Sequence, residues 1–487
     1  MVEFKTMLFK PTFEAINRLL TLKDFSTSGL DAIPSKNSVA LEENTFKLRF
    51  NSVYTDAINK TWMAYLPEYR IRNNEGFEYV IEEGCSCFVG NLIMSRMQKQ
   101  DFVIHVSRIR QCTIDLEKKY FWRFVYPVDH EDWLFRINAA PFKDDFGTTH
   151  TMSMLEMEFG GHTLLLTARS IGDQHFMIID STVEINVVAM ESICNTILTV
   201  LGIVTGKRYG GSRFSLCSDD PAFANIIGLS YHGLQESKTC PYRIFDTSRT
   251  VVLEALSRFD YQQYAKEMIA KDDTDVVWYY NDDSITKDAF NKLLALCNSD
   301  NDMIIAASML LDGTMLNIEY QKPFFSVVLE AVTSSLLKDD MIKPEPPMSW
   351  DRFNKDVRPA LETIIDSYDC ISDEGKSIMK KKLTGVNQAP NANKLTLAFD
   401  RLGYKLTDRD CAAIDGRNHV FHGHLASSKE ELHKQQEALF AESLRLHKLC
   451  CILLFLKAGF KGRLLNNEVL FGIKEACEQK EPPYIDL

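Results

Sequence analysis

The sequence predicts an α+β protein with a β-rich N-terminal region, a mixed middle region and an all-α C-terminal helical bundle. Segments rich in β-branched and aromatic residues, such as FWRFVY at 121–126, are typical of the chain up to residue 185. From Val187 onward the periodicity changes to that of helices. A cluster of three prolines between 338 and 350 then separates the later helices from one another.

A chain of 487 residues is too long for one hydrophobic core, which predicts about three domains. We place them at 1–185, 186–320 and 321–487. The apolar fraction of 45% and the charged fraction of 25% are ordinary for a soluble protein. No signal-peptide core is present near the start, and the longest apolar run, Cys450 to Phe460, is too short to span a bilayer. We therefore expect a cytosolic protein that does not enter a membrane.

The N-terminal region has further strand candidates at 45–50, 102–107 and 175–180. MSMLEMEF and HTLLLTA are joined by Gly160 and Gly161, and a Gly-Gly pair suits the positive φ angles of a tight turn. This spacing predicts a β-hairpin within an antiparallel sandwich or barrel.

The middle region begins with VVAMESICNTILTVLGIV, which is apolar nearly all round and predicts a buried helix ending at the glycine-rich TGKRYGG. Short strands are expected around 225–245. Helices are predicted over 250–270, 287–298, 322–338, 351–368, 373–384 and 392–402.

Two helix starts in the C-terminal region have the pattern of a capping box. Thr407 with Asp410 predicts a helix that runs toward Gly423, and Ser428 with Glu431 predicts a long helix to about residue 458. Leucines recur every seven residues along the second helix, which predicts an apolar seam buried in the same domain or against a second copy. These leucines are Leu432, Leu439, Leu446 and Leu453, with Leu449 and Leu456 beside them.

The net charge of −12 argues against a protein coated in nucleic acid, but the charge is unevenly distributed. The first 320 residues hold 31 basic and 43 acidic side chains, whereas the remainder holds 24 of each. Within the balanced part, 375–417 contains nine basic and four acidic residues. A local basic surface of this kind is what a phosphate-binding site requires.

The stretch DGRNHVFHGH, residues 415–424, concentrates polar groups suited to chemistry on RNA. On a helix, Arg417 and His422 lie about 140° apart around the axis and about 7.5 Å along it. Arginine offers a permanent charge and forked donors for phosphate oxygens, and histidine moves protons near neutral pH. Asn418 lies one turn before His422 and is placed to orient the imidazole or to donate to a phosphate oxygen.

Arg417-Asn418-His419-Val420-Phe421-His422 resembles the RNxxxH form of the motif of HEPN-domain ribonucleases, over a region of about 321–470. This resemblance implies a metal-independent endoribonuclease acting as a homodimer, with Arg417, Asn418 and His422 as catalytic residues. The products would be 2′,3′-cyclic phosphate and 5′-OH ends. The architecture also resembles bacterial anti-phage, abortive-infection proteins of the ApeA-like type. In such proteins the N-terminal region would sense a phage-derived trigger or a regulatory partner.

Alternatives to this interpretation are a non-catalytic HEPN-type binding module or scaffold, and a helix end at which Arg417 and His422 only pair with acids such as Asp415. A metal site at His419, His422 and His424 would need a fourth ligand, and no HExxH or CxxC pattern supports one. We therefore expect neither a metal nor another cofactor. Candidate RNA contacts are Lys380, Lys381, Lys382 and Arg409, for which a solvated helical face is the competing interpretation.

Two further stretches match known functional motifs, but we interpret both as structural. Gly202 to Arg208 resembles a phosphate-binding loop, but it follows a helix, has one residue too few between its glycines and carries Arg208 at the Ser/Thr position. Asp145-Phe146-Gly147 matches a kinase triplet without the accompanying motifs and is predicted to be a turn.

Overall fold

The computed structural model describes residues 6–23, 25–28, 37–42, 45–52, 67–89, 100–129, 136–233, 237–247, 284–338, 346–388, 391–416 and 429–487. Residue contacts divide the chain into two compact units, Met1–Asn298 and Ser299–Leu487. The first unit is built on a large β-sheet and the second is helical, as the sequence predicts at this coarse level. The expected middle region, 186–320, is shared between the two units.

The described strands of the first unit form one 12-stranded sheet, one 4-stranded sheet and a two-stranded pair of β15 (Lys207–Arg208) and β18 (Lys238–Thr239). The described pairings within the large sheet are antiparallel except the parallel pair of β1 with β11. In sheet order its strands are β1 (Thr6–Met7), β11 (Ala140–Asp144), β12 (Thr149–Phe159), β13 (His162–Ile171), β14 (Gln174–Ser181), β10 (Phe121–Val128), β16 (Arg213–Ser218), β17 (Ile226–His232), β9 (Arg108–Gln111), β6 (Glu78–Ile81), β5 (Tyr69–Arg72) and β2 (Ser26–Ser28). The smaller sheet has the order β3 (Asn37–Glu42), β4 (Thr45–Ser52), β8 (Gln100–Val106) and β7 (Ser86–Val89).

The predicted hairpin of β12 and β13 is confirmed. Phe159 pairs with His162, and the two residues between them, Gly160 and Gly161, have φ angles of 55° and 80°. Positive φ at both central positions is the geometry of the two-residue turn that matches the twist of paired strands. The predicted strands at 45–50, 102–107, 121–126 and 175–180 are likewise present.

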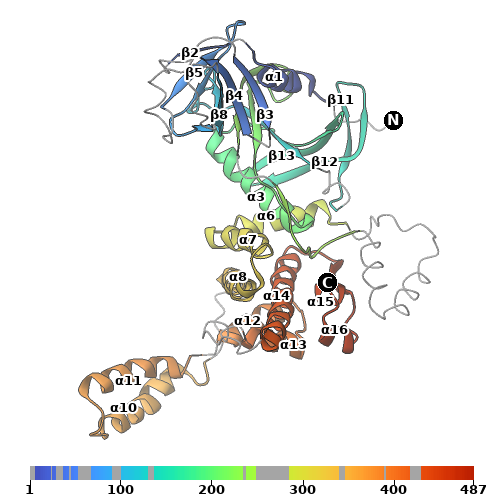
Figure 1. Ribbon diagram of the computed structural model, residues 1–487. Helices are drawn as coiled ribbons and strands as arrows, with labels where there is room; N and C mark the ends of the chain where they lie inside the picture. The colour runs from blue at the N-terminus through green and yellow to red at the C-terminus, as the bar shows by residue number, and fades with distance from the viewer. Residues whose placement is uncertain are drawn as a thin grey trace, which may run out of the picture. The chain divides into compact units, whose positions relative to one another are not determined.

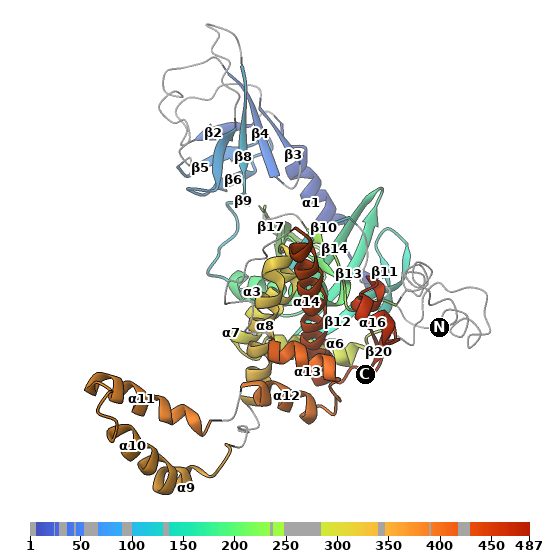
Figure 2. The ribbon, with the colours of Figure 1, turned by 60° about the horizontal axis from the view of Figure 1, so that its bottom comes forward.

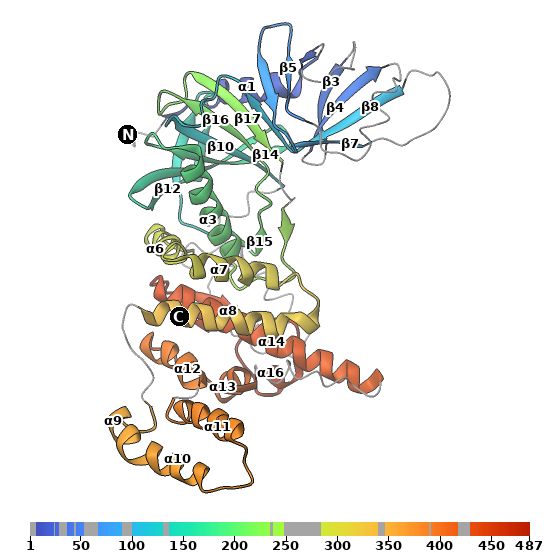
Figure 3. The same cartoon turned by 90° about the vertical axis from the view of Figure 1, so that its left-hand side faces the viewer.

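Helices cover both faces of the large sheet (Figure 3). On one face, α1 (Lys10–Leu20) buries Ile16 and Leu19 in a cluster that includes Val125 of β10. Tyr126 points to the opposite face, because neighbouring strand residues alternate, and its side chain hydrogen-bonds Cys194 of α3 (Val187–Thr205). The sequence pattern predicts α3, whereas α1 was not predicted.

The apolar helix α3 ends as predicted, with Gly206 in the left-handed conformation at a φ of 67°. In the described part of the chain it is the one helix long and apolar enough to cross a membrane. Of its most apolar stretch, 67% is buried within the chain, which is typical of a core helix. The helix expected over 250–270 lies outside the described residues.

Helix α6 (Lys287–Cys297), predicted over 287–298, is the last helix of the first unit. The second unit is built around two long helices. α8 (Ile318–Lys338) and α14 (Lys429–Lys457) lie side by side (Figure 2), and α7 (Asn301–Gly313), which was not predicted, packs on α8. Leu446, Leu449 and Leu453 of the leucine seam are fully buried here. They are therefore not available to a second copy of the chain.

The other helices of this unit are shorter: α12 (Asn391–Arg401), α13 (Asp408–Asp415), α15 (Asn467–Leu470) and α16 (Lys474–Glu478), beside a two-stranded sheet of β19 (Arg463–Leu465) and β20 (Tyr484–Asp486). The helix expected over 351–368 is divided into α9 (Trp350–Arg352), a π-helical turn over Phe353–Val357 and α10 (Arg358–Asp366). The ring of Pro359 prevents a normal helical hydrogen bond at this point, which accounts for the irregular turn before it. α10 lies beside α11 (Asp373–Val386) in a helical hairpin (Figure 1).

Candidate functional site

Arg417, Asn418 and His422, the residues predicted to be catalytic, lie outside the described residues, as do His419 and His424. The structure describes the chain on both sides of them. Helix α13 ends at Asp415, followed by Gly416, and α14 begins at Lys429. The candidate site is therefore described through the two helices that flank this segment in the sequence, α13 before it and α14 after it.

Helix α13 begins with the predicted capping box, which is confirmed. The backbone N–H of Asp410 donates to Oγ1 of Thr407 at 3.2 Å, and the backbone N–H of Thr407 donates to Oδ2 of Asp410 at 3.0 Å. This reciprocal pair satisfies two amides that the helix itself leaves without partners. It fixes the start of the helix that leads into the RNxxxH segment.

The Asp410 carboxylate also binds α14. Its Oδ1 atom accepts from Arg445 at 2.7 Å and lies 3.7 Å from Nζ of Lys448. The Arg445 side chain is 3% exposed, and the same guanidinium contacts Glu468 at 2.6 Å and Glu481 at 2.8 Å. One buried arginine thus connects α13, α14 and the two C-terminal carboxylates.

The network formed around Arg445 has three cations and three anions, so its formal charges cancel: Arg409, Arg445 and Lys448 against Asp410, Glu468 and Glu481. Compensation matters because a buried charge is tolerated only when it is paired and hydrogen-bonded. We call these six residues the Arg445 network. Its members come from α13, α14, α15 and the chain end near β20.

Burial alone would raise the pKa of the Asp410 carboxyl, but the Lys448 charge, the Thr407 hydrogen bonds and the Arg445 charge outweigh it. The pKa of Asp410 is therefore held below its ordinary value. The same balance acts at Glu481, where burial is opposed by Arg445 and Lys448, and its pKa is also lowered. Both carboxyls are thus ionised at neutral pH, as the network requires.

Lys322, a charged residue outside the Arg445 network, lies beside the start of the predicted site. Lys322 of α8 is 4% exposed, and its ammonium pairs with Glu442 of α14. A β-carbon placed on Gly416 would lie 3.8 Å from Nζ of Lys322. This cation is therefore next to the residue that precedes Arg417. Sequence reasoning missed Lys322 because nothing in its local pattern distinguishes a buried lysine from a solvated one.

The structure locates the predicted RNA contacts on two different elements. Arg409 donates to Glu468 at 2.8 Å and to Glu481, as part of the Arg445 network. Lys380, Lys381 and Lys382 lie on α11, where Lys380 pairs with Asp366 of α10 at 2.7 Å and the other two are exposed. α11 packs against α10, whereas α13 packs against α12 and α14.

The two motif matches that were interpreted as structural have structural roles. Gly202 lies inside α3, and the ammonium of Lys207, with a side chain 4% exposed, lies 3.4 Å from Asp129. Asp145 starts a turn whose Gly147 has a φ of 87°, and its carboxylate accepts from the backbone N–H groups of Phe9 and Lys10 at 2.9 Å each. It thereby caps the start of α1.

Among the residues that the structure describes, no group of three or more His, Cys, Asp or Glu side chains is arranged to hold a metal ion. Comparison of the chain with models of known protein families, with curated proteins and with solved structures finds no match.

Proposed function

We propose that the chain is a metal-independent endoribonuclease of the HEPN type, acting in the cytosol in anti-phage defence or as a toxin. The observation that carries the proposal is the RNxxxH constellation of Arg417, Asn418 and His422 in a helical unit. Support comes from its position between α13 and α14, which the buried Arg445 network joins. A reaction site requires such rigid supports because small displacements of reacting groups slow catalysis strongly.

In the proposed reaction the ribose 2′-oxygen attacks the adjacent phosphorus as its proton is removed. The bond from phosphorus to the 5′-oxygen breaks, and that oxygen leaves with a proton. His422 moves one of these protons, and Arg417 stabilises the negative charge that builds on the phosphate oxygens. Asn418 orients the imidazole or donates to a phosphate oxygen. The products are a 2′,3′-cyclic phosphate and a 5′-hydroxyl.

For RNA binding we propose Lys380, Lys381 and Lys382 as contacts to the phosphate backbone, since lysine charges supply sequence-independent affinity. Arg409 is already engaged with Glu468 and Glu481, and we assign it to the support of α13. We further propose a homodimer through the helical unit, so that Arg417 and His422 of two protomers face one cleft. The N-terminal unit would then sense a trigger or restrain the nuclease.

The test is cleavage of total RNA by the purified full-length chain, compared with Arg417→Ala and His422→Ala. Each substitution should lower the cleavage rate at least about 100-fold, the usual contribution of proton transfer or charge stabilisation. EDTA should have no effect. His424→Ala is the matched control, because it removes a neighbouring histidine outside the RNxxxH pattern and should retain activity.

Other outcomes would favour other functions. Loss of cleavage in EDTA and in His424→Ala would point to a metal site made of the three histidines. Retention of RNA or a nucleotide by the purified chain, without cleavage, would point to a non-catalytic binding module. Cleavage by both single variants at the rate of the parent would show that Arg417 and His422 are not catalytic residues.

A further inference from the structure

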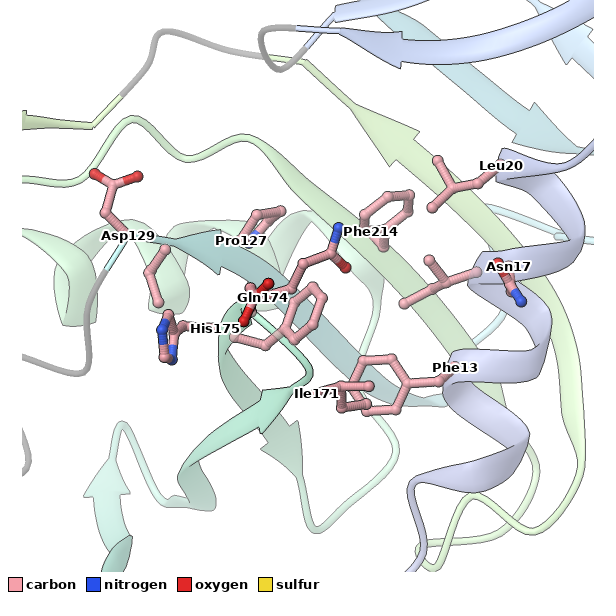
Figure 4. A pocket seen from close by; sticks show the side chains of 13 residues that line it. Phe13, Asn17, Leu20, Pro127, Asp129, Ile171, Gln174, His175 and Phe214 are labelled. Atoms are coloured by element: carbon pink, nitrogen blue, oxygen red, sulfur yellow. The ribbon is translucent and has the colours of Figure 1, made fainter.

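A pocket of about 720 Å³ opens in the first unit between helix α1 and the ends of strands β10, β13 and β14 (Figure 4). Its volume lies in the range of small-molecule sites, which is roughly 300–1,000 Å³. None of the residues that line it belongs to the RNxxxH segment or to the Arg445 network. The inference drawn from it therefore does not depend on the proposed ribonuclease activity.

The inner surface of the pocket is apolar and rich in aromatic rings. Phe176 and Phe214 are buried residues of its lining, and Phe13 of α1 forms part of its wall (Figure 4). The rings of Phe13 and Phe176 lie 5.1 Å apart between centroids, tilted by 54°. Rings tilted and spaced in this way give an inserted aromatic group both edge and face contacts. Aliphatic groups complete the lining, namely Ile16, Leu20, Pro127, Val128 and Ile171.

The rim of the pocket is polar. Neither lysine nor arginine lines it, and its one imidazole, that of His175, has Nδ1 at 2.8 Å from Oγ of Ser170. Asn17 and Gln174 contribute amides, and Asp129 and Asp173 contribute carboxylates. Of the two carboxylates, Asp129 lies 3.4 Å from the Lys207 ammonium, which balances its charge. Asp173 is exposed in the turn between β13 and β14. A rim of this composition repels anions and offers acceptors to a cationic or donor-rich group.

The wall that α1 forms is fixed by contacts that involve no ligand. Arg123 makes two hydrogen bonds of 2.7 Å to the Asp180 carboxylate and donates to Oγ1 of Thr12 in α1 at 2.7 Å. The same guanidinium donates to the carbonyl of Leu8 at 2.5 Å. Together with the cap from Asp145, these bonds hold the helix on the sheet. A preformed site of this kind binds with little ordering cost.

We propose that this pocket binds a small aromatic molecule carrying a protonated amine. The ring would enter among Phe13, Phe176 and Phe214, and the ammonium group would stay at the rim beside Asp173 and the two amides. Phosphates and carboxylates are poor ligands here, because no lysine or arginine lines the pocket to receive them.

Titration calorimetry of the full-length chain with tryptamine, and separately with 3-indolepropionate, tests this proposal. The two probes share an aromatic ring and differ in the sign of their charge. Tryptamine should bind at least tenfold more tightly. Asp173→Lys should weaken tryptamine binding about tenfold or more, since a charge-assisted hydrogen bond contributes at least that factor. Asp219→Lys, a reversal at an exposed carboxylate of the same unit outside the pocket, is the matched control and should leave the affinity unchanged.

A second variant, Ile171→Trp, fills the pocket from the half-buried end of β13 and should abolish tryptamine binding. Because Asp173 is exposed, its substitution keeps the test decisive even if Ile171→Trp does not fold. The proposal is overturned if neither probe binds, if both bind equally, or if Asp173→Lys binds tryptamine like the parent.

Discussion

Oδ1 of Asp410 lies 2.7 Å from a guanidinium nitrogen of Arg445, and both side chains are almost completely buried. This contact joins α13 to α14 across 35 positions of sequence. The RNxxxH segment lies between these helices in the chain. The ion pair of Asp410 with Arg445 therefore holds together the two helices that flank the proposed site.

Asp410→Asn should destabilise the second unit by about 3 kcal/mol or more. The substitution keeps the shape of the side chain but leaves the Arg445 network with a buried uncompensated charge, which typically costs 3–5 kcal/mol. Urea-induced unfolding measures the loss. Asp408→Asn is the matched control on the same helix turn, where the carboxylate is exposed, and it should cost under about 1 kcal/mol. Equal effects of the two substitutions would contradict the assigned role of the network.

The second unit should lose stability in acid. The pKa values of Asp410 and Glu481 are lower in the folded chain than their ordinary values of 3.8 and 4.5. Their contribution is therefore fully present above those ordinary values and is lost as the pH falls through the folded pKa values. The free energy of unfolding should drop between about pH 5 and pH 3, and less steeply in Asp410→Asn. Parallel pH profiles of the two proteins would be inconsistent with this origin.

Two glycines should respond in opposite ways to alanine. Gly206 has a φ of 67°, and a β-carbon there would overlap that of Arg243, so Gly206→Ala should destabilise by more than about 1 kcal/mol. Gly416 has a φ of −72° and only ordinary contacts around an added β-carbon. Gly416→Ala should therefore be neutral or stabilise by about 0.4–1 kcal/mol. Thermal unfolding distinguishes these outcomes, and a destabilised Gly416→Ala would refute the second.

A homodimer through the helical unit should appear in light scattering as twice the 55.7 kDa chain mass. The buried leucines cannot supply its contacts, whereas Ile364 and Tyr368 of the α10–α11 hairpin are 53% and 55% exposed. Ile364→Glu with Tyr368→Glu should shift the mass toward the monomer. Ile305→Glu, at a similarly exposed position on α7, is the control. A parent chain that is monomeric at every concentration would contradict the proposed homodimer.

Local sequence signals predicted the elements that depend on neighbouring residues. Gly160 and Gly161 predicted a hairpin because a tight turn needs positive φ angles, and Thr407 with Asp410 predicted the cap of α13 because both partners lie in one turn. Of the missed helices, α7 does carry a local signal, because the Asp300 side chain accepts from the backbone N–H of Met303, whereas the cap of α1 is not local. α1 begins without a side-chain cap of its own, since Asp145, about 135 residues away, supplies it.

The surroundings of the proposed site were less predictable than its flanking helices. The ion pairs of the Arg445 network join residues separated by 20 to 72 positions, and no local periodicity reveals such pairs. For the same reason Arg409 was considered only as a surface cation, and Lys322 was not considered. Several strand segments were predicted, but their assembly into a 12-stranded and a 4-stranded sheet depends on long-range pairing that alternating patterns do not specify.

The most direct measurement is end-group analysis of RNA incubated with the full-length chain and with His422→Ala. We expect new 2′,3′-cyclic phosphate and 5′-hydroxyl ends with the parent protein, in the presence of EDTA, and none with the variant. New 3′-hydroxyl and 5′-phosphate ends, or cyclic phosphate ends formed equally by His422→Ala, would contradict the proposed function.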